Sequence, residues 1–466
     1  MQPGNSTVTR WLEARPKALL TFYAALAAFT TYFCMYAFRK PFSVATFDGL
    51  DFFGLAINGN ALTLKGAIVI SQLLGYMISK YLGIKFCSEI TWQQRSRVLF
   101  ALVGVAWLSL LVYGLLPGPY KVFAIFFNGL PLGMVWGLVT GYLEGRTTSE
   151  ILLAALSCSF IIGSSMTKDV GKWLMSETGL GVAEGWVGFV TGAVFIVPFA
   201  IAVWMLSQLP QPDTHDIKER IQRKPMDRRE RWAFVRQFLP GLIMLIAIYF
   251  LLTAYRDYWD NFGAELFKEL GYGETPGIFT ATSLPIAFGV MAALALLALI
   301  RNNRLGLLAV YLLMLGGILL TAGATLAYQA DLVSGAAWMT LIGLGTYLTY
   351  VPFGSVLFDR IIAETGTIAT AVFAIYLADA IGYTGAVGIV FYKDFFASNA
   401  GSVAFFANYT YLMAGVGVAC LTGSCVYFLG RSSDEPHTAS QAQAAEDAAL
   451  QDADTPPTVN TNPATA

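Results

Sequence analysis

The chain contains 466 residues, of which 56% are hydrophobic and 13% are charged, and its formal net charge is −1. An ordinary soluble domain has roughly 25% charged residues, so this composition excludes a typical soluble protein and indicates a membrane protein. The basic residues form no basic domain or basic helix, which argues against a nucleic-acid partner.

Twelve apolar runs follow one another along the chain. A helix of about 20 residues crosses the ~30 Å hydrocarbon core of a bilayer, so each run predicts one transmembrane helix. We therefore predict an all-α membrane protein with twelve transmembrane helices in two pseudo-symmetric six-helix bundles. The runs cover residues 18–47, 62–84, 98–117, 121–143, 150–170 and 186–207, then 237–262, 276–300, 306–328, 334–357, 366–392 and 404–429.

One long polar stretch, between the sixth and seventh runs, divides the two halves. The C-terminal tail is rich in Ala, Thr, Asp, Gln and Pro without periodicity, which predicts disorder. The predicted organisation is an N-terminal segment (1–17), a first bundle (18–207), a central loop (208–236), a second bundle (237–430) and a disordered tail (431–466).

Basic residues are distributed unevenly between the two sides of the predicted membrane domain. The side with the N-terminus and the central loop carries 19 Lys and Arg, and the other side carries four. The positive-inside rule therefore predicts that both termini are cytoplasmic. The first 17 residues are polar and the next apolar run is too long for a cleavable signal peptide. We expect a multi-pass protein of a bacterial inner membrane.

Residue types that bind metals or haem are scarce within the apolar runs. The two histidines, His215 and His437, lie in hydrophilic segments, so no pair of intramembrane histidines can bind haem or a metal. The five cysteines form no C-x-x-C pair and are expected to be core residues. We therefore expect no metal and no cofactor.

Six basic residues lie within or at the ends of apolar runs, and two of them, both arginines, occupy matching positions of related hexapeptides. Residues 37–42 read AFRKPF and residues 254–259 read AYRDYW, in the first helix of each predicted bundle. Parallel repeats would place Arg39 and Arg256 at similar depth on opposite sides of a central site. The other four basic residues are Lys40, Lys65, Lys80 and Lys168.

Two interpretations of the arginines remain open from the helix pattern. Both side chains could extend to the membrane interface, where aromatic neighbours are common. Alternatively, the two guanidinium groups could bind one phosphate or carboxylate bidentately in a site where water is scarce. Burying two like charges without an anion is costly, so such a site would favour an anionic ligand.

Asp260, Lys168 and Lys65 are further charged residues in or beside the apolar runs. Asp260 lies four residues after Arg256 and could pair with it on one helix face, whereas Asp257 is expected to point elsewhere. Lys168 is either a third cation of an anion site or a lysine at a helix end. Lys65 is expected at the interface.

Asp379 lies deep in its apolar run, where an isolated carboxylate is costly. It is therefore expected to be protonated, to pair with a Lys or Arg of the other bundle, or to carry a proton during transport.

Short motifs in matching order resemble the organophosphate:phosphate antiporters of the major facilitator superfamily, a glycerol-3-phosphate transporter-like family. The resemblance covers most of the twelve-helix region, and each motif alone is weak. The matching segments are Tyr32-x-x-x-Tyr36-x-x-Arg39-Lys40, Tyr76-x-x-Ser79-Lys80, Gly133-Met134-Val135-Trp136, Tyr255-Arg256-Asp257, Tyr350-Val351-Pro352 and Gly382-Tyr383.

This resemblance implies a major facilitator transporter with an anion site between the bundles. The family's histidine in the fifth helix has no counterpart near Ser157, and the Asp-Arg signature after the second helix is degraded, which indicates a separate bacterial branch. The implied substrate-binding residues are Arg39, Arg256, Lys40, Lys80, Lys168, Tyr32, Tyr36, Tyr76, Trp136, Tyr350 and Tyr383, with Asp260 and Asp379 as candidate coupling or counter-ion residues.

We interpret the chain as a monomeric secondary active transporter of a small anionic, phosphorylated solute, with inorganic phosphate as a candidate counter-substrate. The first alternative is a proton-coupled symporter of a sugar, carboxylate or drug-like solute, with Asp379 carrying the proton. A membrane-embedded transferase would need a catalytic cluster, and the short loops contain no His-Asp pair, metal set or phosphate-binding glycine loop. We therefore do not expect an enzyme, and a sensor remains a further alternative.

Overall fold

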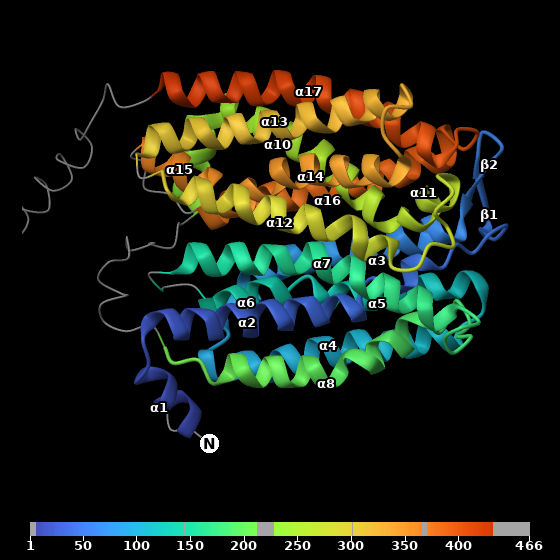
Figure 1. The fold of residues 1–466 in the computed structure, drawn as a ribbon, viewed down its shortest axis with the longest axis horizontal. Helices are drawn as coiled ribbons and strands as arrows, with labels where there is room; N and C mark the ends of the chain where they lie inside the picture. The colour runs from blue at the N-terminus through green and yellow to red at the C-terminus, as the bar shows by residue number, and fades with distance from the viewer. Residues whose placement is uncertain are drawn as a thin grey trace, which may run out of the picture.

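The computed structural model describes residues 6–143, 146, 148–211, 228–300, 302–365 and 371–431. Helices dominate these residues and run side by side along the long axis of the molecule (Figure 1). The predicted tail after Arg431 and most of the predicted central loop, 208–236, lie outside the described residues.

The first half of the chain forms one bundle, drawn from blue to green in Figure 1. Each of its six predicted runs contains one helix or a broken pair of helices. Its elements are α1 (Thr7–Glu13), α2 (Lys17–Met35), η1 (Tyr36–Phe38), η2 (Pro41–Val44), β1 (Asp51–Ile57), β2 (Asn60–Thr63), α3 (Leu64–Glu89), α4 (Trp92–Leu115), η3 (Gly118–Tyr120), α5 (Lys121–Leu132), α6 (Val135–Leu143), α7 (Ser149–Met175) and α8 (Val187–Ser207).

The second half forms the other bundle, drawn from green to red. Its first long helix begins at Arg228, so the last part of the predicted central loop is helical. Its elements are α10 (Arg228–Asn261), α11 (Gly263–Glu269), α12 (Ile278–Ala298), α13 (Asn303–Gln329), α14 (Gly335–Ser355), α15 (Leu357–Thr365), α16 (Ala371–Phe396) and α17 (Ser402–Gly430).

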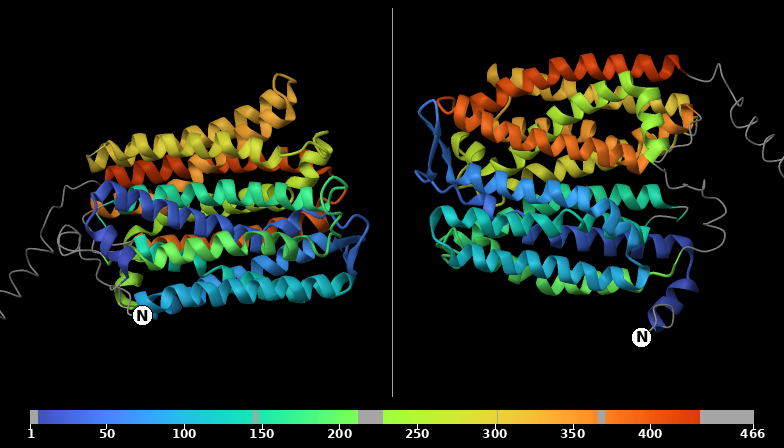
Figure 2. Two further views of the ribbon diagram at one scale, coloured as in Figure 1. Left: turned by 60° about the horizontal axis from the view of Figure 1, so that its bottom comes forward. Right: turned by 180° about the vertical axis from the view of Figure 1, so that it is seen from behind.

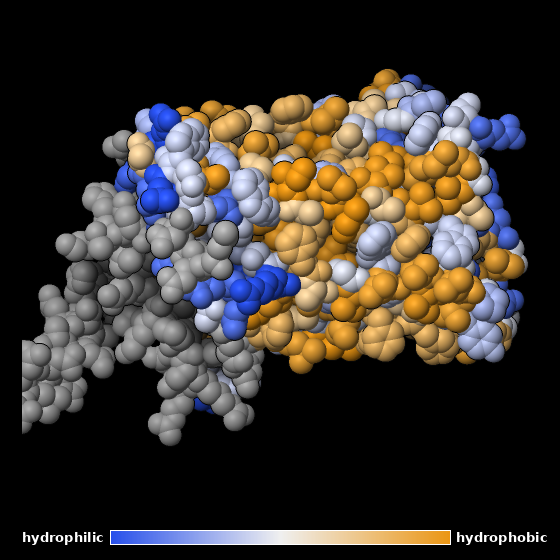
Figure 3. Space-filling view, turned by 90° about the horizontal axis from the view of Figure 1, so that it is seen from below, coloured by the Kyte–Doolittle hydropathy of each residue, from blue (hydrophilic) through white to orange (hydrophobic). Residues whose placement is uncertain are grey.

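These helices have the dimensions and surface of a membrane domain. In the described part of the chain, nine spans are long and apolar enough to cross a membrane, and the bent pair α14–α15 makes a tenth. Helices α3 and α16, of 26 residues each, occupy the two other predicted runs. Figure 3 shows a broad hydrophobic surface between more hydrophilic ends. The predicted fold of twelve helices in two bundles is confirmed.

The two bundles meet along a seam. Helix α7 packs against α12, and α3 packs against α16, so the first bundle contacts the second on both sides of the molecular centre. The described chain begins and ends at the same end of the bundles, which we call the terminal end (Figure 1). The opposite end carries strands β1 and β2 and is called the hairpin end (Figures 1 and 2).

The first transmembrane segment is not one continuous helix, contrary to the prediction for residues 18–47. Helix α2 ends at Met35, and two short 3-10 turns, η1 and η2, follow. Proline has no N–H for the helical hydrogen bond and clashes with the preceding turn, so Pro41 ends the α-helical pattern here. Arg39 and Lys40 therefore lie between two tight turns and not on a regular helix.

A two-stranded antiparallel sheet lies between the first two transmembrane segments and was not predicted. Strands β1 and β2 pair with Ile57 opposite Asn60, and Asn58 and Gly59 form the turn. Both turn residues have positive φ, 54° and 80°. Asn-Gly is the pair that two-residue hairpin turns prefer, because both positions need positive φ. The Asn60–Thr63 strand leads directly into α3, where the Thr63 hydroxyl accepts a hydrogen bond from Gly66 N and caps the helix.

Candidate functional site

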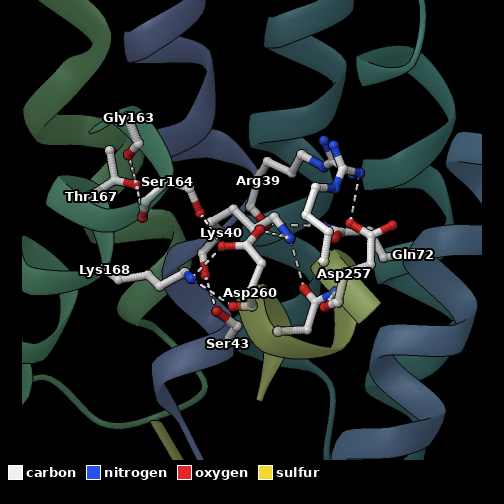
Figure 4. A network of polar contacts seen from close by, with 12 residues as sticks. Arg39, Lys40, Ser43, Gln72, Gly163, Ser164, Thr167, Lys168, Asp257 and Asp260 are labelled. Carbon is white, nitrogen blue, oxygen red and sulfur yellow. Dashed lines mark hydrogen bonds and ion pairs between the residues drawn. The ribbon is translucent and has the colours of Figure 1, made fainter. Parts of the chain in front are cut away.

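Charged side chains from both bundles gather at the seam (Figure 4). Arg39 and Lys40 come from the turns after α2, and Lys168 comes from α7. Asp257 and Asp260 come from the last turns of α10. All five side chains are buried. Arg256 is also buried, with 9% of its surface exposed. The interpretation that Arg39 and Arg256 extend to the membrane interface is therefore wrong.

Asp260 connects two lysines of the first bundle to the second bundle. Its Oδ2 lies 2.5 Å from Lys40 Nζ, and its Oδ1 lies 2.5 Å from Lys168 Nζ. The Ser164 hydroxyl donates to Asp260 Oδ1 at 2.5 Å, and Lys168 also donates to the Asp260 carbonyl at 2.6 Å. Lys40 donates further to Asn261 Oδ1 at 2.8 Å. This carboxylate is thus shared between two cations across the seam.

The predicted pairing of Arg256 with Asp260 is wrong. Arg256 Nη2 lies 3.0 Å from Asp257 Oδ1, although Asp257 was expected to point elsewhere. The long arginine side chain can reach the carboxylate of the adjacent residue, and two lysines of the other bundle bind Asp260 instead. The second oxygen, Asp257 Oδ2, is buried without a hydrogen-bond partner.

Arg39 is held by aromatic rings rather than by a carboxylate. Its guanidinium carbon lies 3.9 Å from the centre of the Tyr76 ring and 5.8 Å from that of Tyr36. Among the described residues Arg39 takes part in no ion pair, and its Nε is buried without a hydrogen-bond partner. A ring face attracts a cation by a desolvated cation–π contact, but it leaves the N–H donors of the guanidinium unsatisfied.

Arg256 has a similar aromatic contact in the other bundle, and the two arginines share neighbours. Its guanidinium carbon lies 4.2 Å from the centre of the Tyr350 ring. The phenol groups of Tyr36 and Tyr383 interact electrostatically with both Arg39 and Arg256. One guanidinium from each bundle therefore borders the same group of tyrosines at the seam.

The turns that carry Arg39 are held by two buried amides that were not predicted from the sequence. Gln72 Nε2 donates to the Arg39 carbonyl at 3.0 Å and to Asn128 Oδ1 at 2.7 Å. Asn128 Nδ2 donates to the Phe38 carbonyl at 2.8 Å. A broken helix inside a membrane domain needs such partners, because its freed carbonyls cannot bind water.

Lys80 and Asp379 form a second ion pair across the seam, between α3 and α16. Lys80 Nζ lies 3.3 Å from Asp379 Oδ2, so the expectation that Asp379 pairs with a cation of the other bundle is confirmed. The Tyr249 hydroxyl donates to Asp379 Oδ1 at 2.5 Å, and its oxygen lies 3.1 Å from the Tyr350 hydroxyl oxygen. Tyr249 was not predicted, because it lies outside every matched motif.

The six aromatic residues named from the sequence border this cluster. Tyr32 contacts Tyr36 and Trp136, with ring centroids 5.6 and 5.0 Å apart, and Tyr76 contacts Tyr383 at 4.9 Å. Phe160 of the first bundle contacts Tyr347 of the second at 5.8 Å and continues the aromatic surface across the seam. Tyr350 completes the set through its contact with Arg256.

Further polar contacts join the bundles at the hairpin end. Lys65, at the start of α3, is buried and paired with Glu265, and its predicted interfacial position stays a prediction. Asp169 accepts hydrogen bonds from Phe279 N and Thr280 N, at the start of α12.

The ion pair between Lys268 and Asp48, also at the hairpin end, is exposed to solvent. Lys268 Nζ lies 2.8 Å from Asp48 Oδ2, and this lysine lowers the pKa of the Asp48 carboxyl. Together these contacts close the seam at the hairpin end.

Solved structures of known proteins share this fold. A D-xylose-proton symporter aligns with 87% of this chain and 96% of its own length, with a TM-score of 0.55 and 14% sequence identity. The nucleoside transporter NupG aligns with 88% of this chain and 99% of its own length, with the same TM-score and identity. The protein is therefore a multi-pass membrane protein with the major facilitator fold.

Residues 41–431 match the model of DUF5690, which is described as a family of unknown function, and the chain belongs to this family. Comparison with curated proteins gives no match. The finer resemblance to organophosphate:phosphate antiporters therefore stays a prediction.

Proposed function

We propose that this protein is a secondary active transporter of a small anionic, phosphorylated solute. The observation that supports this is an excess of positive charge buried at the seam. In the described part of the chain, five cations contribute, and three carboxylates pair with them, those of Asp257, Asp260 and Asp379. The five cations are Arg39, Lys40, Lys80, Lys168 and Arg256.

An anion would complete this cluster. Burial of an unpaired charge is costly, and a phosphate carries both the charge and the acceptor oxygens that the cluster lacks. Arg39 and Arg256 would bind the phosphate oxygens, because a guanidinium group can donate two parallel hydrogen bonds to one phosphate. Lys40, Lys80 and Lys168 would add positive potential, and Tyr32, Tyr36, Tyr76, Trp136, Tyr350 and Tyr383 would shape the pocket.

The proposed cycle uses rigid rocking of one bundle against the other around the loaded site. A bound anion would offset the repulsion between Arg39 and Arg256 as the bundles close. Inorganic phosphate would serve as the counter-substrate. The positive-inside rule places both termini in the cytoplasm of a bacterium, with the hairpin end outside. The carrier would act as a monomer, because each copy contains both halves of the site.

Uptake into proteoliposomes tests the proposal. Vesicles loaded with phosphate should take up labelled phosphate, and Arg39→Ala and Arg256→Ala should each abolish most of this exchange. Arg10→Ala is the matched control, because Arg10 is exposed on α1. If both seam variants exchange phosphate as well as the control does, the proposed anion site is wrong.

A proton-coupled symporter is the second candidate, and the partly buried Asp379 favours it. Protonation would release this carboxyl from Lys80 and would couple a proton to movement at the seam. A D-xylose-proton symporter shares the fold. Uptake driven by a pH gradient, independent of phosphate inside the vesicle and abolished by Asp379→Asn, would support this candidate and contradict phosphate exchange.

A further inference from the structure

The β1–β2 hairpin attaches the first bundle to the second at the hairpin end. Strand β2 lies against α16, and both strands contact α3. Asn60 Nδ2 donates to the Phe395 carbonyl at 2.8 Å. Asp394 Oδ2 accepts hydrogen bonds from Thr63 N and Thr63 Oγ1, at 3.1 and 2.8 Å. The hairpin thus lies over the line where α3 meets α16, at the edge of the molecule (Figure 2).

The hairpin and the residue before it carry large apolar side chains that the described residues leave about half exposed. Leu50, Phe53, Leu55 and Ile57 expose 51%, 54%, 49% and 43% of their surfaces. Exposed apolar surface costs about 25 cal/mol per Å² in water. A two-stranded hairpin alone is also marginally stable there. An apolar environment around β1 would remove both costs.

This apolar patch continues into a surface that faces lipid. The Phe53 ring contacts the Tyr120 ring, with centroids 5.3 Å apart. Tyr120 precedes α5, and Phe123 and Phe127 follow at three- and four-residue spacing, which places them on one helix face. All three are more than half exposed. Within a membrane domain, such a stripe on an outer helix faces the acyl chains.

The other flank of the hairpin has the same character. Tyr392 and Phe396 lie one turn apart on α16 and stack at 6.0 Å, and both are more than half exposed. They flank the segment that the hairpin binds, Asp394 and Phe395. Aromatic residues gather where a bilayer meets water. The hairpin therefore lies between two aromatic surfaces at the level of the membrane interface.

We propose that the hairpin is a membrane-contacting strap, whose residues Leu50, Phe53, Leu55 and Ile57 insert into the headgroup and acyl boundary of the leaflet at the hairpin end. The partner is the lipid surface itself, because the patch is continuous with the lipid-facing stripe on α5. The polar tip, Asn58 and Gly59, extends away from this patch toward water. The strap holds α3 to α16 while its apolar side rests in the leaflet. This inference is independent of the transported solute.

Site-directed spin labelling in liposomes tests the strap. Nitroxide labels at Leu55→Cys and Phe127→Cys should collide more with oxygen, which concentrates in hydrocarbon, than with water-soluble Ni-EDDA. A label at Asn58→Cys, three residues from Leu55 at the turn, is the matched control and should show the reverse preference. Labelled wild-type protein measures the signal of the native cysteines. All three positions are exposed, so the substitutions leave the packed core intact.

Two results would overturn the inference. The first is a label at Leu55→Cys that is as accessible to Ni-EDDA as the label at Asn58→Cys, which would place the patch in water. The second is dipolar broadening at Leu55→Cys that grows with protein density in the membrane, which would identify a second copy of the chain as the partner. Neither result would affect phosphate exchange, so the strap and the proposed function fail separately.

Discussion

Lys168 and Asp260 lie 2.5 Å apart across the seam and join α7 of one bundle to α10 of the other. Because Lys40 binds the same carboxylate at 2.5 Å, one acid compensates two buried cations. The contacts at the seam are therefore coupled, because the loss of Asp260 would leave both lysines without this carboxylate.

The first prediction concerns this shared carboxylate. Lys168→Met and Asp260→Asn should each lower the stability of the purified protein, because breaking a buried ion pair typically costs about 3–5 kcal/mol. The double variant should lose clearly less than the sum of the two single variants, since it removes both charges together. Thermal unfolding of the four proteins measures the coupling. Lys17→Met, at an exposed position, is the control. Additive losses would show that the pair contributes no coupling energy.

The second prediction separates charge from geometry at Arg39. Arg39→Lys keeps the positive charge but removes the planar donors that bind phosphate bidentately. The stabilisation of the wild-type protein by added phosphate should therefore shrink in this variant, while stability without phosphate changes less. A phosphate titration followed by melting temperature measures this, because only a ligand that binds the folded state stabilises it by mass action. An unchanged phosphate response would mean that charge alone suffices.

The third prediction concerns Gln72, which positions the turns beside Arg39. Gln72→Leu leaves the Arg39 carbonyl and the Asn128 side chain without a donor, and each such loss costs about 1–3 kcal/mol. We expect a lower melting temperature and weaker phosphate exchange that a higher phosphate concentration partly restores. Gln93→Leu, an exposed position on α4, is the comparison. If the two variants behave alike, Gln72 does not hold the turns.

The fourth prediction is a pH effect at the hairpin end. The Lys268 ammonium lowers the pKa of Asp48, so the pair stabilises the folded state at pH values above the ordinary aspartate pKa of about 3.9. The contribution is lost as the pH falls through the lowered pKa of Asp48. Both side chains are mostly exposed, so the effect should be small and should weaken in high salt. The melting-temperature difference between wild type and Asp48→Asn should therefore disappear in acid, and a difference that persists there has another cause.

The transmembrane helices could be predicted from the sequence, because the length and hydropathy of the apolar runs determine them. The twelve runs predicted the helices, and the burial of Arg39 and Arg256 supports one of the two interpretations that the related hexapeptides left open. The hairpin was also detectable, because Asn58-Gly59 is a strong turn signal between short apolar segments. The continuous run over residues 18–47 obscured the break after Met35, since hydropathy alone cannot distinguish a helix from the short turns beside Pro41.

Partners within the site could not be predicted in the same way. Spacing along one helix favoured Arg256 with Asp260, but the actual partners of Asp260 come from the other bundle. Tertiary packing decides such pairs, and nothing in the local sequence encodes it. Gln72 and Asn128 were missed for a related reason, because polar residues in apolar helices reveal their role only when the carbonyls that they bind are known.

Because the first transmembrane segment is broken after Met35, Arg39 and Arg256 lie in segments of different stiffness. Arg256 lies on the helical part of α10 that follows the kink at Phe238, whereas Arg39 lies between short turns held by two amide side chains. In the proposed transport cycle, the segment around Arg256 would keep its position and the turns around Arg39 would move with the bound solute. The two related hexapeptides would therefore give the site one arginine in a fixed position and one in an adjustable position.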